Sequence, residues 1–225
     1  MRSLIPNALT ALNLVIGFFA IINTYQGNYT TAAWLVVAAL VADGLDGRVA
    51  RYFNVSSDFG KELDSLCDLV SFGVAPAFLA YVFQLHEFGV GGALTAAAFA
   101  TCGALRLARF NVMTGTVKGY FLGLPIPTAG CVVATFVMLG LKPSGYAFLI
   151  MVAIFAYLMV STVRYPDFKG KGGEPIRKIP VVIAVILAGY ILFMYPSSFL
   201  FVPFFCYSVF GILNNLFALF ESKSA

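Results

Sequence analysis

Long apolar stretches recur along the whole chain and constrain its fold more than any other feature. A helix that crosses a bilayer needs about 20 mostly apolar residues, and 60% of the 225 residues are hydrophobic whereas 11% are charged. The sequence therefore predicts an all-α bundle of about eight membrane-spanning helices. The expected spans are residues 6–25, 30–53, 62–85, 91–112, 125–141, 145–163, 180–195 and 198–219.

The connections between these spans leave no room for a separate water-soluble domain. Residues 1–225 are therefore expected to form one integral-membrane domain. The four cysteines are scattered singly through apolar runs, which favours neither a metal–thiolate cluster nor a disulfide framework. Neither a P-loop nor a basic-aromatic surface is present in the sequence, so nucleic acid is not an expected partner.

Basic residues predict how the bundle is oriented. Lys and Arg in short loops favour the cytoplasmic side of a membrane, and an eight-span topology with a cytoplasmic N-terminus places all 14 of them there except Lys142. Both termini are then cytoplasmic. The basic loop at residues 164–178 is interpreted as a topology determinant that attracts anionic lipid head groups, with substrate recruitment as the alternative.

Acidic residues gather at the predicted cytoplasmic ends of the second and third spans. Residues 43–68 contain six of the 10 carboxylates, although an ionisable group at membrane depth is costly unless it has a partner, an ion or a wet cavity. Asp43 and Asp46 are three residues apart, and Asp64 and Asp68 are four apart, so each pair shares one helix face. Two helices joined by a tight loop would direct four carboxylates at one point. Such oxygen ligands suit Mg²⁺, Mn²⁺ or Ca²⁺, with room for two ions.

Small residues and a cation continue the same face of the second span. Gly47 and Ala50 leave space beside Asp43 and Asp46, and Arg51 supplies a bidentate cation. Metal ions beside such a cation suit a diphosphate, which points to phosphoryl transfer. The alternative is a set of helix-end salt bridges to Arg48, Arg51 and Lys61, and this alternative does not explain the helical spacing of the acids.

The segment from residue 43 to residue 68 fits the pattern D-x-x-D-G-x-x-A-R, eight residues, G-x-x-x-D-x-x-x-D. This pattern resembles the signature of the CDP-alcohol phosphotransferases, and the chain departs from it at no fixed position. The resemblance implies that Asp43, Asp46, Asp64 and Asp68 bind the metal ions and that Asp68 is also the general base. It implies a CDP-lipid site that comprises Asn7, Thr10, Gly47, Arg51 and Ser57. Asn7 has an alternative role as a helix cap.

Three further segments resemble the serine-using branch of the family, the phosphatidylserine synthases of bacteria and archaea. They are LDSLCDLVSFGVAPA, ALRLARFNV and GLPIPTAG. The second segment places Arg106 and Arg109 near the cytoplasmic end of the fourth span, where a fixed cation would bind the serine carboxylate. Arg109 is the preferred candidate. The alternative is that both arginines extend to lipid phosphates and only set the topology.

The expected activity is transfer of the phosphatidyl group of CDP-diacylglycerol, or of the archaeal ether lipid CDP-archaeol, to L-serine. The resemblance also implies a homodimer. We expect the protein in the plasma membrane, among membrane lipids, and the charge pattern places the active site at the cytoplasmic face. One alternative keeps the chemistry but uses glycerol 3-phosphate or an inositol phosphate as acceptor. A cation transporter is a second alternative, although the repeated halves typical of carriers are not evident.

Overall fold

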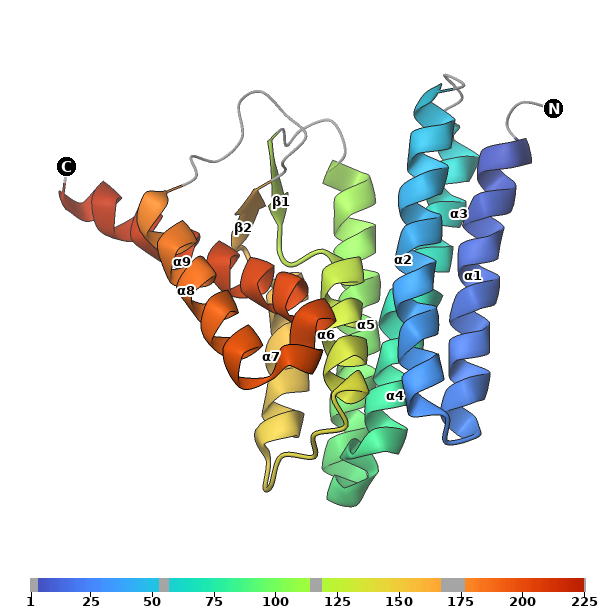
Figure 1. Ribbon diagram of the computed structural model, residues 1–225. Coiled ribbons are helices and arrows are strands. Elements are labelled where there is room, and N and C mark those ends of the chain that lie inside the picture. Colours follow the sequence, from blue (N-terminus) through green and yellow to red (C-terminus); the bar gives the residue numbers. More distant parts are fainter. Residues whose placement is uncertain (1–3, 53–56, 114–118, 167–176, 225) are drawn as a thin grey trace.

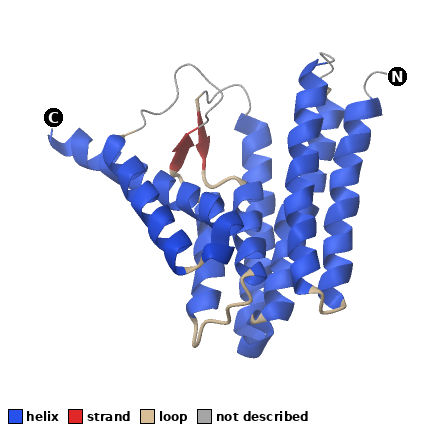
Figure 2. Ribbon diagram, viewed as in Figure 1, coloured by secondary structure: helices blue, strands red, loops and turns tan. Residues whose placement is uncertain are grey.

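The computed structural model describes residues 4–52, 57–113, 119–166 and 177–224, and these residues form a bundle made almost entirely of α-helices (Figure 2). The prediction of an all-α class is confirmed. The α-helices are α1 (Leu4–Tyr25), α2 (Tyr29–Tyr52), α3 (Asp58–Asp68), α4 (Ala75–Phe83), α5 (Gly89–Met113), α6 (Ile126–Met138), α7 (Ala147–Val160), α8 (Lys178–Met194) and α9 (Phe201–Ser224).

The first three helices pack at one side of the bundle, and α8 and α9 lie at the opposite side (Figure 1). Helix α1 runs antiparallel beside α2, and the two are joined by a short turn in which Gly27 has φ 80°. A positive φ is readily adopted by glycine, which explains why the chain reverses here. Helices α5, α6 and α7 occupy the middle, where α6 is buried along most of its length.

Helix α3, the π-helix η1 (Leu69–Val74) and α4 form one continuous helix that begins within the acidic segment. The π-helix begins directly after Asp68 and leads into α4 without a break. The combined helix spans 26 residues, Asp58–Phe83. A π-helical turn widens the local winding and is frequent at functional sites. Two short 3₁₀ segments, η2 (Leu85–Phe88) and η3 (Pro196–Leu200), precede α5 and α9.

One small sheet departs from the expectation of helices alone. Strands β1 (Tyr120–Leu122) and β2 (Arg164–Pro166) pair antiparallel, with Phe121 opposite Tyr165. Both strands lie in segments that we predicted to be connections. Tyr165 is completely buried and packs against Gly211 of α9, where an added Cβ would lie 2.1 Å from the tyrosine ring. The sheet therefore connects the C-terminal helices to the bundle.

Among the described residues, four helices are long and apolar enough to cross a membrane, so the chain is a membrane protein. They are Pro6–Tyr25, Asp58–Phe83, Leu85–Met113 and Pro196–Ala218. Helices α6, α7 and α8 are apolar but shorter, with 13, 14 and 17 residues. At 1.5 Å per residue, a 13-residue helix is only about 20 Å long, which is less than the roughly 30 Å of a bilayer core.

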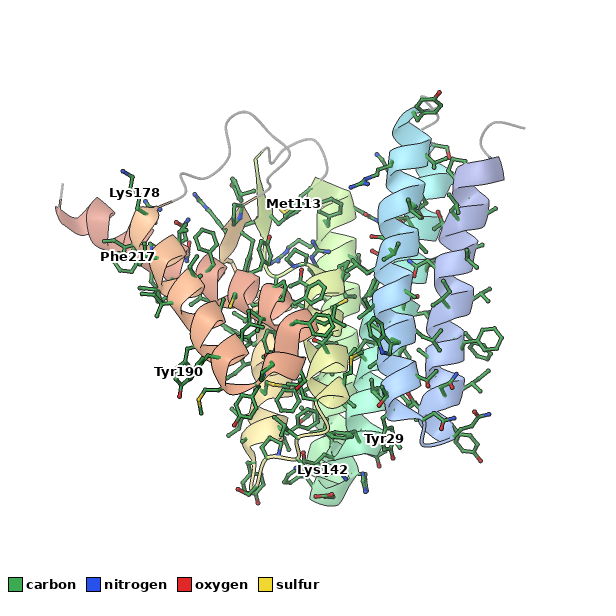
Figure 3. The ribbon with its side chains drawn as sticks, viewed as in Figure 1. Tyr29, Met113, Lys142, Lys178, Tyr190 and Phe217 are labelled. Carbon is green, nitrogen blue, oxygen red and sulfur yellow. The ribbon has the colours of Figure 1, made fainter. Side chains whose placement is uncertain are left out.

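The two ends of the bundle differ in their charged residues. Figure 3 shows Lys178 and Met113 toward one end and Lys142 and Tyr29 toward the other. Helix α1 begins, and α9 ends, on the same side of the molecule as Lys178 (Figure 1). Lys142 and Lys178 therefore lie toward opposite ends of the bundle.

Candidate active site

Helices α2 and α3 bring members of both acidic pairs together. Asp43 of α2 and Asp64 and Asp68 of α3 each offer one carboxylate oxygen, and these oxygens lie within 4.8 Å of one another. Asp43 and Asp64 are half-buried, whereas Asp68 is only 7% exposed. Three negative charges at this separation repel one another strongly when they lack a cation.

Asp46, the fourth predicted carboxylate, lies beside this group. It is 5% exposed and interacts electrostatically with Asp64. Its Oδ2 accepts a hydrogen bond of 2.7 Å from the Thr10 hydroxyl of α1. Asp46 is thus held by α1, while its partner Asp43 belongs to the group of three.

Helix α1 also holds Asp68. The amide Nδ2 of Asn13, a completely buried residue, donates to Asp68 Oδ1 at 3.1 Å. Thr10 and Asn13 are three residues apart, so they project from the same helix face toward the two acidic helices. One face of α1 therefore orients a carboxylate of α2 and a carboxylate of α3.

A second contact fixes α1 against the helix that carries Asp68. Ser71 of η1 donates its hydroxyl hydrogen to the backbone oxygen of Asn13 at 2.9 Å. Gly17, one turn further along α1, lies so close that an added Cβ would be 2.3 Å from Ser71 Oγ. The absence of a side chain at Gly17 is what permits this approach.

The acidic group fits a divalent metal ion. Among the described residues, the side chains that donate hydrogen bonds to Asp46 and Asp68 are the neutral Thr10 and Asn13 of α1. Clustered carboxylate oxygens without His or Cys are the donors that Mg²⁺, Mn²⁺ and Ca²⁺ prefer. Asp43, Asp64 and Asp68 are the residues whose geometry suits one ion, and Asp46 lies next to them.

The predicted CDP-lipid residues belong to α1, α2 and the start of α3. Ser57 is the N-cap of α3, and its Oγ accepts from the Gly60 amide at 3.0 Å. Asn7 lies within α1, which begins at Leu4, so it is not the N-cap of that helix. Gly47 is half-buried on α2. The side chain of Arg51 lies outside the described part of the structure.

Arg109 is engaged by backbone carbonyls. Its Nη1 donates to Val160 at 3.0 Å, and its Nη2 lies within hydrogen-bond distance of three more carbonyl oxygens. These belong to Leu122 at 2.8 Å, Met159 at 3.2 Å and Ser161 at 3.1 Å. Arg109 thereby joins the C-terminal end of α7 to β1. The helix dipole favours a cation at the C-terminal end of α7.

Arg106 has different surroundings from Arg109, although only one turn of α5 separates them. It is 7% exposed, and its Nε has no hydrogen-bond partner among the described residues. The guanidinium lies 5.5 Å from the centre of the Phe110 ring and interacts electrostatically with Asp68. Arg106 is therefore a buried cation whose charge acts on Asp68.

Two groups of polar residues were missed by sequence reasoning. Asn13 was not predicted, although a polar residue one turn after Thr10 in an apolar helix indicated it. Asn111 near the end of α5 donates to Ser65 Oγ at 3.0 Å and to Glu62 of α3. No local pattern indicates this link, because its partners are 46 and 49 residues away.

The fold and the site together define an integral-membrane protein with an acidic centre suited to a divalent metal. Residues 3–163 match a sequence model of the CDP-alcohol phosphatidyltransferase family. The chain belongs to this family. Helices α8 and α9 lie beyond the matched residues.

Relatives from bacteria and archaea carry related names. The chain is 39% identical over 223 residues to the CDP-diacylglycerol–serine O-phosphatidyltransferase of Helicobacter pylori (strain ATCC 700392 / 26695), covering 96% of this chain and 92% of that protein. It is 37% identical over 170 residues to the enzyme of the same name from Bacillus subtilis, covering 76% and 94%. It is 39% identical over 172 residues to the archaetidylserine synthase of Methanothermobacter thermautotrophicus, covering 76% and 72%.

Proposed function

We propose that this protein transfers the phosphatidyl group of a CDP-diacylglycerol-type lipid, or of its ether analogue CDP-archaeol, to the hydroxyl of L-serine. The products are phosphatidylserine, or its ether analogue, and CMP. The observation that carries the proposal is the group of carboxylates from α2 and α3 at one end of a membrane-embedded bundle. The names of the relatives support serine as the acceptor.

The acidic residues are assigned to metal binding and proton transfer. Asp43, Asp46, Asp64 and Asp68 would hold one or two divalent ions, Mg²⁺ or Mn²⁺ in the first place and Ca²⁺ as the alternative. Such ions neutralise diphosphate oxygens and stabilise charge on a leaving group. The assigned CDP-lipid contacts are Asn7, Thr10, Gly47, Arg51 and Ser57. Thr10 contributes by holding Asp46 in place through its 2.7 Å hydrogen bond.

The reaction follows as a single displacement. Asp68 accepts the proton of the serine hydroxyl. The serine oxygen forms a bond to the phosphorus that carries diacylglycerol, and the bond from that phosphorus to the bridging oxygen of CMP breaks. Arg51 is assigned to stabilise the charge that develops on departing CMP. The serine carboxylate is assigned to the basic end of α5, where Arg106 and Arg109 lie.

The proposed topology places this site at the cytoplasmic face of the plasma membrane. The shorter helices α6, α7 and α8 and the acidic helix α2 would complete about eight crossings, and both termini would be cytoplasmic. The separation of Lys142 from Lys178 in Figure 3 supports this orientation. Residues 1–225 would act as one domain, and two copies would form a homodimer.

The proposed function is tested by measuring CMP release from CDP-diacylglycerol with a panel of acceptors. Purified protein with Mg²⁺ or Mn²⁺ is expected to release CMP with L-serine and not with glycerol 3-phosphate or an inositol phosphate. Release with either phosphate and none with serine would refute serine as the acceptor. Metal transport into vesicles without CMP release would refute the reaction class.

A further inference from the structure

Two buried polar atoms that lack a hydrogen-bond partner in the described part of the chain belong to residues that interact with Asp68. They are Oδ1 of Asn13, from α1, and Nε of Arg106, from α5. Asn13 is 0% exposed and Arg106 is 7% exposed. Most buried polar atoms in proteins are paired, because leaving one unpaired is unfavourable. Two unpaired atoms around one carboxylate therefore indicate a ligand that supplies both partners.

The Arg106 side suits an anion. Its guanidinium interacts electrostatically with Asp68, yet the two groups form no ion pair among the described residues. Arg109, the neighbouring cation on α5, already donates to four backbone carbonyls. A planar guanidinium binds a carboxylate through a pair of hydrogen bonds. Arg106 is thus better placed than Arg109 for the carboxylate of a small substrate.

The Asn13 side suits a positively charged donor. Its Nδ2 is held by Asp68 Oδ1 at 3.1 Å, so Oδ1, which is bonded to the same carbon, also lies beside Asp68. A carboxamide oxygen only accepts hydrogen bonds. A charged donor forms a stronger hydrogen bond than a neutral one, so an ammonium group is the preferred partner for this buried oxygen.

We propose that Asn13 and Arg106 form the subsite that recognises the acceptor as a zwitterionic amino alcohol. Arg106 binds the carboxylate, Asn13 Oδ1 accepts a hydrogen bond from the ammonium group, and the hydroxyl lies at Asp68 between them. This inference rests on the proposed function and adds the residues that determine its specificity. Glycerol 3-phosphate lacks the ammonium group and carries a phosphate in place of the carboxylate, so it does not satisfy both residues.

Acceptor analogues that each lack one charge test the subsite. Serinamide has a neutral amide in place of the carboxylate, and 3-hydroxypropionate lacks the ammonium group. We expect Arg106→Gln to lower the ratio of kcat/KM for serine to that for serinamide by at least about tenfold. We expect Asn13→Ala to lower the ratio of kcat/KM for serine to that for 3-hydroxypropionate by a smaller factor, about fivefold. An analogue that is not turned over is measured by its Ki against serine.

These ratios separate recognition from a structural role. Asn13→Ala also removes the hydrogen bond to Asp68, but that loss slows every acceptor equally and cancels in the ratio. Arg106→Lys keeps the charge and is expected to give an intermediate serine-to-serinamide ratio. This variant provides the test if Arg106→Gln does not fold. The matched controls are Asn23→Ala in α1, whose amide donates to Phe19 of the same helix, and Arg164→Gln, whose guanidinium lies 4.9 Å from the Tyr120 ring centre. Both should leave the ratios unchanged.

The outcomes distinguish this subsite from the proposed function. If wild-type protein releases no CMP with serine, the proposed function itself fails. If wild-type protein uses serine but Arg106→Gln and Arg106→Lys slow serine and serinamide equally, Arg106 does not bind the carboxylate and the subsite is overturned. An unchanged serine to 3-hydroxypropionate ratio in Asn13→Ala would overturn the assignment of the ammonium group.

Discussion

Gly130 is a position where the packing behind Asp68 leaves no room for a side chain. An added Cβ on this α6 residue would lie 2.5 Å from the backbone oxygen and 2.9 Å from the Cα of Phe72, which belongs to η1. Both neighbours are backbone atoms, so Gly130→Ala must separate α6 from η1. Because η1 begins directly after Asp68, this separation also displaces the carboxylate.

The magnitude follows from comparison with a glycine in open space. Gly189 of α8 has no atom within 4 Å of an added Cβ, so Gly189→Ala should gain about 1 kcal/mol from helix propensity. Gly130→Ala gains the same amount but loses about 1–3 kcal/mol through overpacking. The free energies of unfolding of the two variants should therefore differ by about 1–3 kcal/mol.

Unfolding by sodium dodecyl sulfate, monitored for both variants in the same mixed micelles, measures this difference. CMP release measures the effect on the site, where a displacement of about 1 Å is expected to reduce turnover by up to roughly 100-fold. Equal free energies of unfolding and equal turnover in Gly130→Ala and Gly189→Ala would refute the close contact between α6 and η1.

Four further outcomes follow from the site. Asp68→Asn should abolish turnover while CDP-lipid binding is partly retained, and near-normal turnover would exclude Asp68 as the base. Chelation should stop CMP release, and added Mn²⁺ should restore it. Asp64→Asn should weaken Mn²⁺ binding measured by electron paramagnetic resonance, and unchanged binding would show that Asp64 is not a metal ligand. Arg109→Gln should destabilise the protein by roughly 2 kcal/mol, because carbonyls at the end of α7 lose a charged donor, and a raised serine KM at unchanged stability would contradict this role. Labelled CMP should not exchange into CDP-lipid without serine, and exchange would indicate a covalent intermediate.

The acidic site was predictable because its information is local. Asp43 and Asp46 share one helix face, as do Asp64 and Asp68, and helical spacing alone indicates that each pair acts together. The tight connection between the two helices then limits how far apart the pairs lie. The apolar runs likewise predicted the positions of the helices, since a helix in lipid must satisfy its own backbone hydrogen bonds.

Other features depend on contacts between distant residues and were not predicted. Arg109 was the preferred partner for serine by sequence, but its hydrogen-bond partners lie 13 and 50 to 52 residues away, in β1 and at the end of α7. The pairing of β1 with β2 is also long-range. Each strand has three residues, which is too few for a periodic pattern of apolar residues. The unpaired atoms of Asn13 and Arg106 become visible only when α1, α3 and α5 are placed together.

The most direct test of the account follows labelled L-serine and CMP in the same reaction. Purified protein is incubated with CDP-diacylglycerol, Mn²⁺ and carbon-labelled serine, and label in the lipid phase is compared with CMP in the aqueous phase. The account predicts equal molar amounts of the two products, both lost on chelation and both absent with Asp68→Asn. CMP release without label in the lipid would contradict transfer to serine.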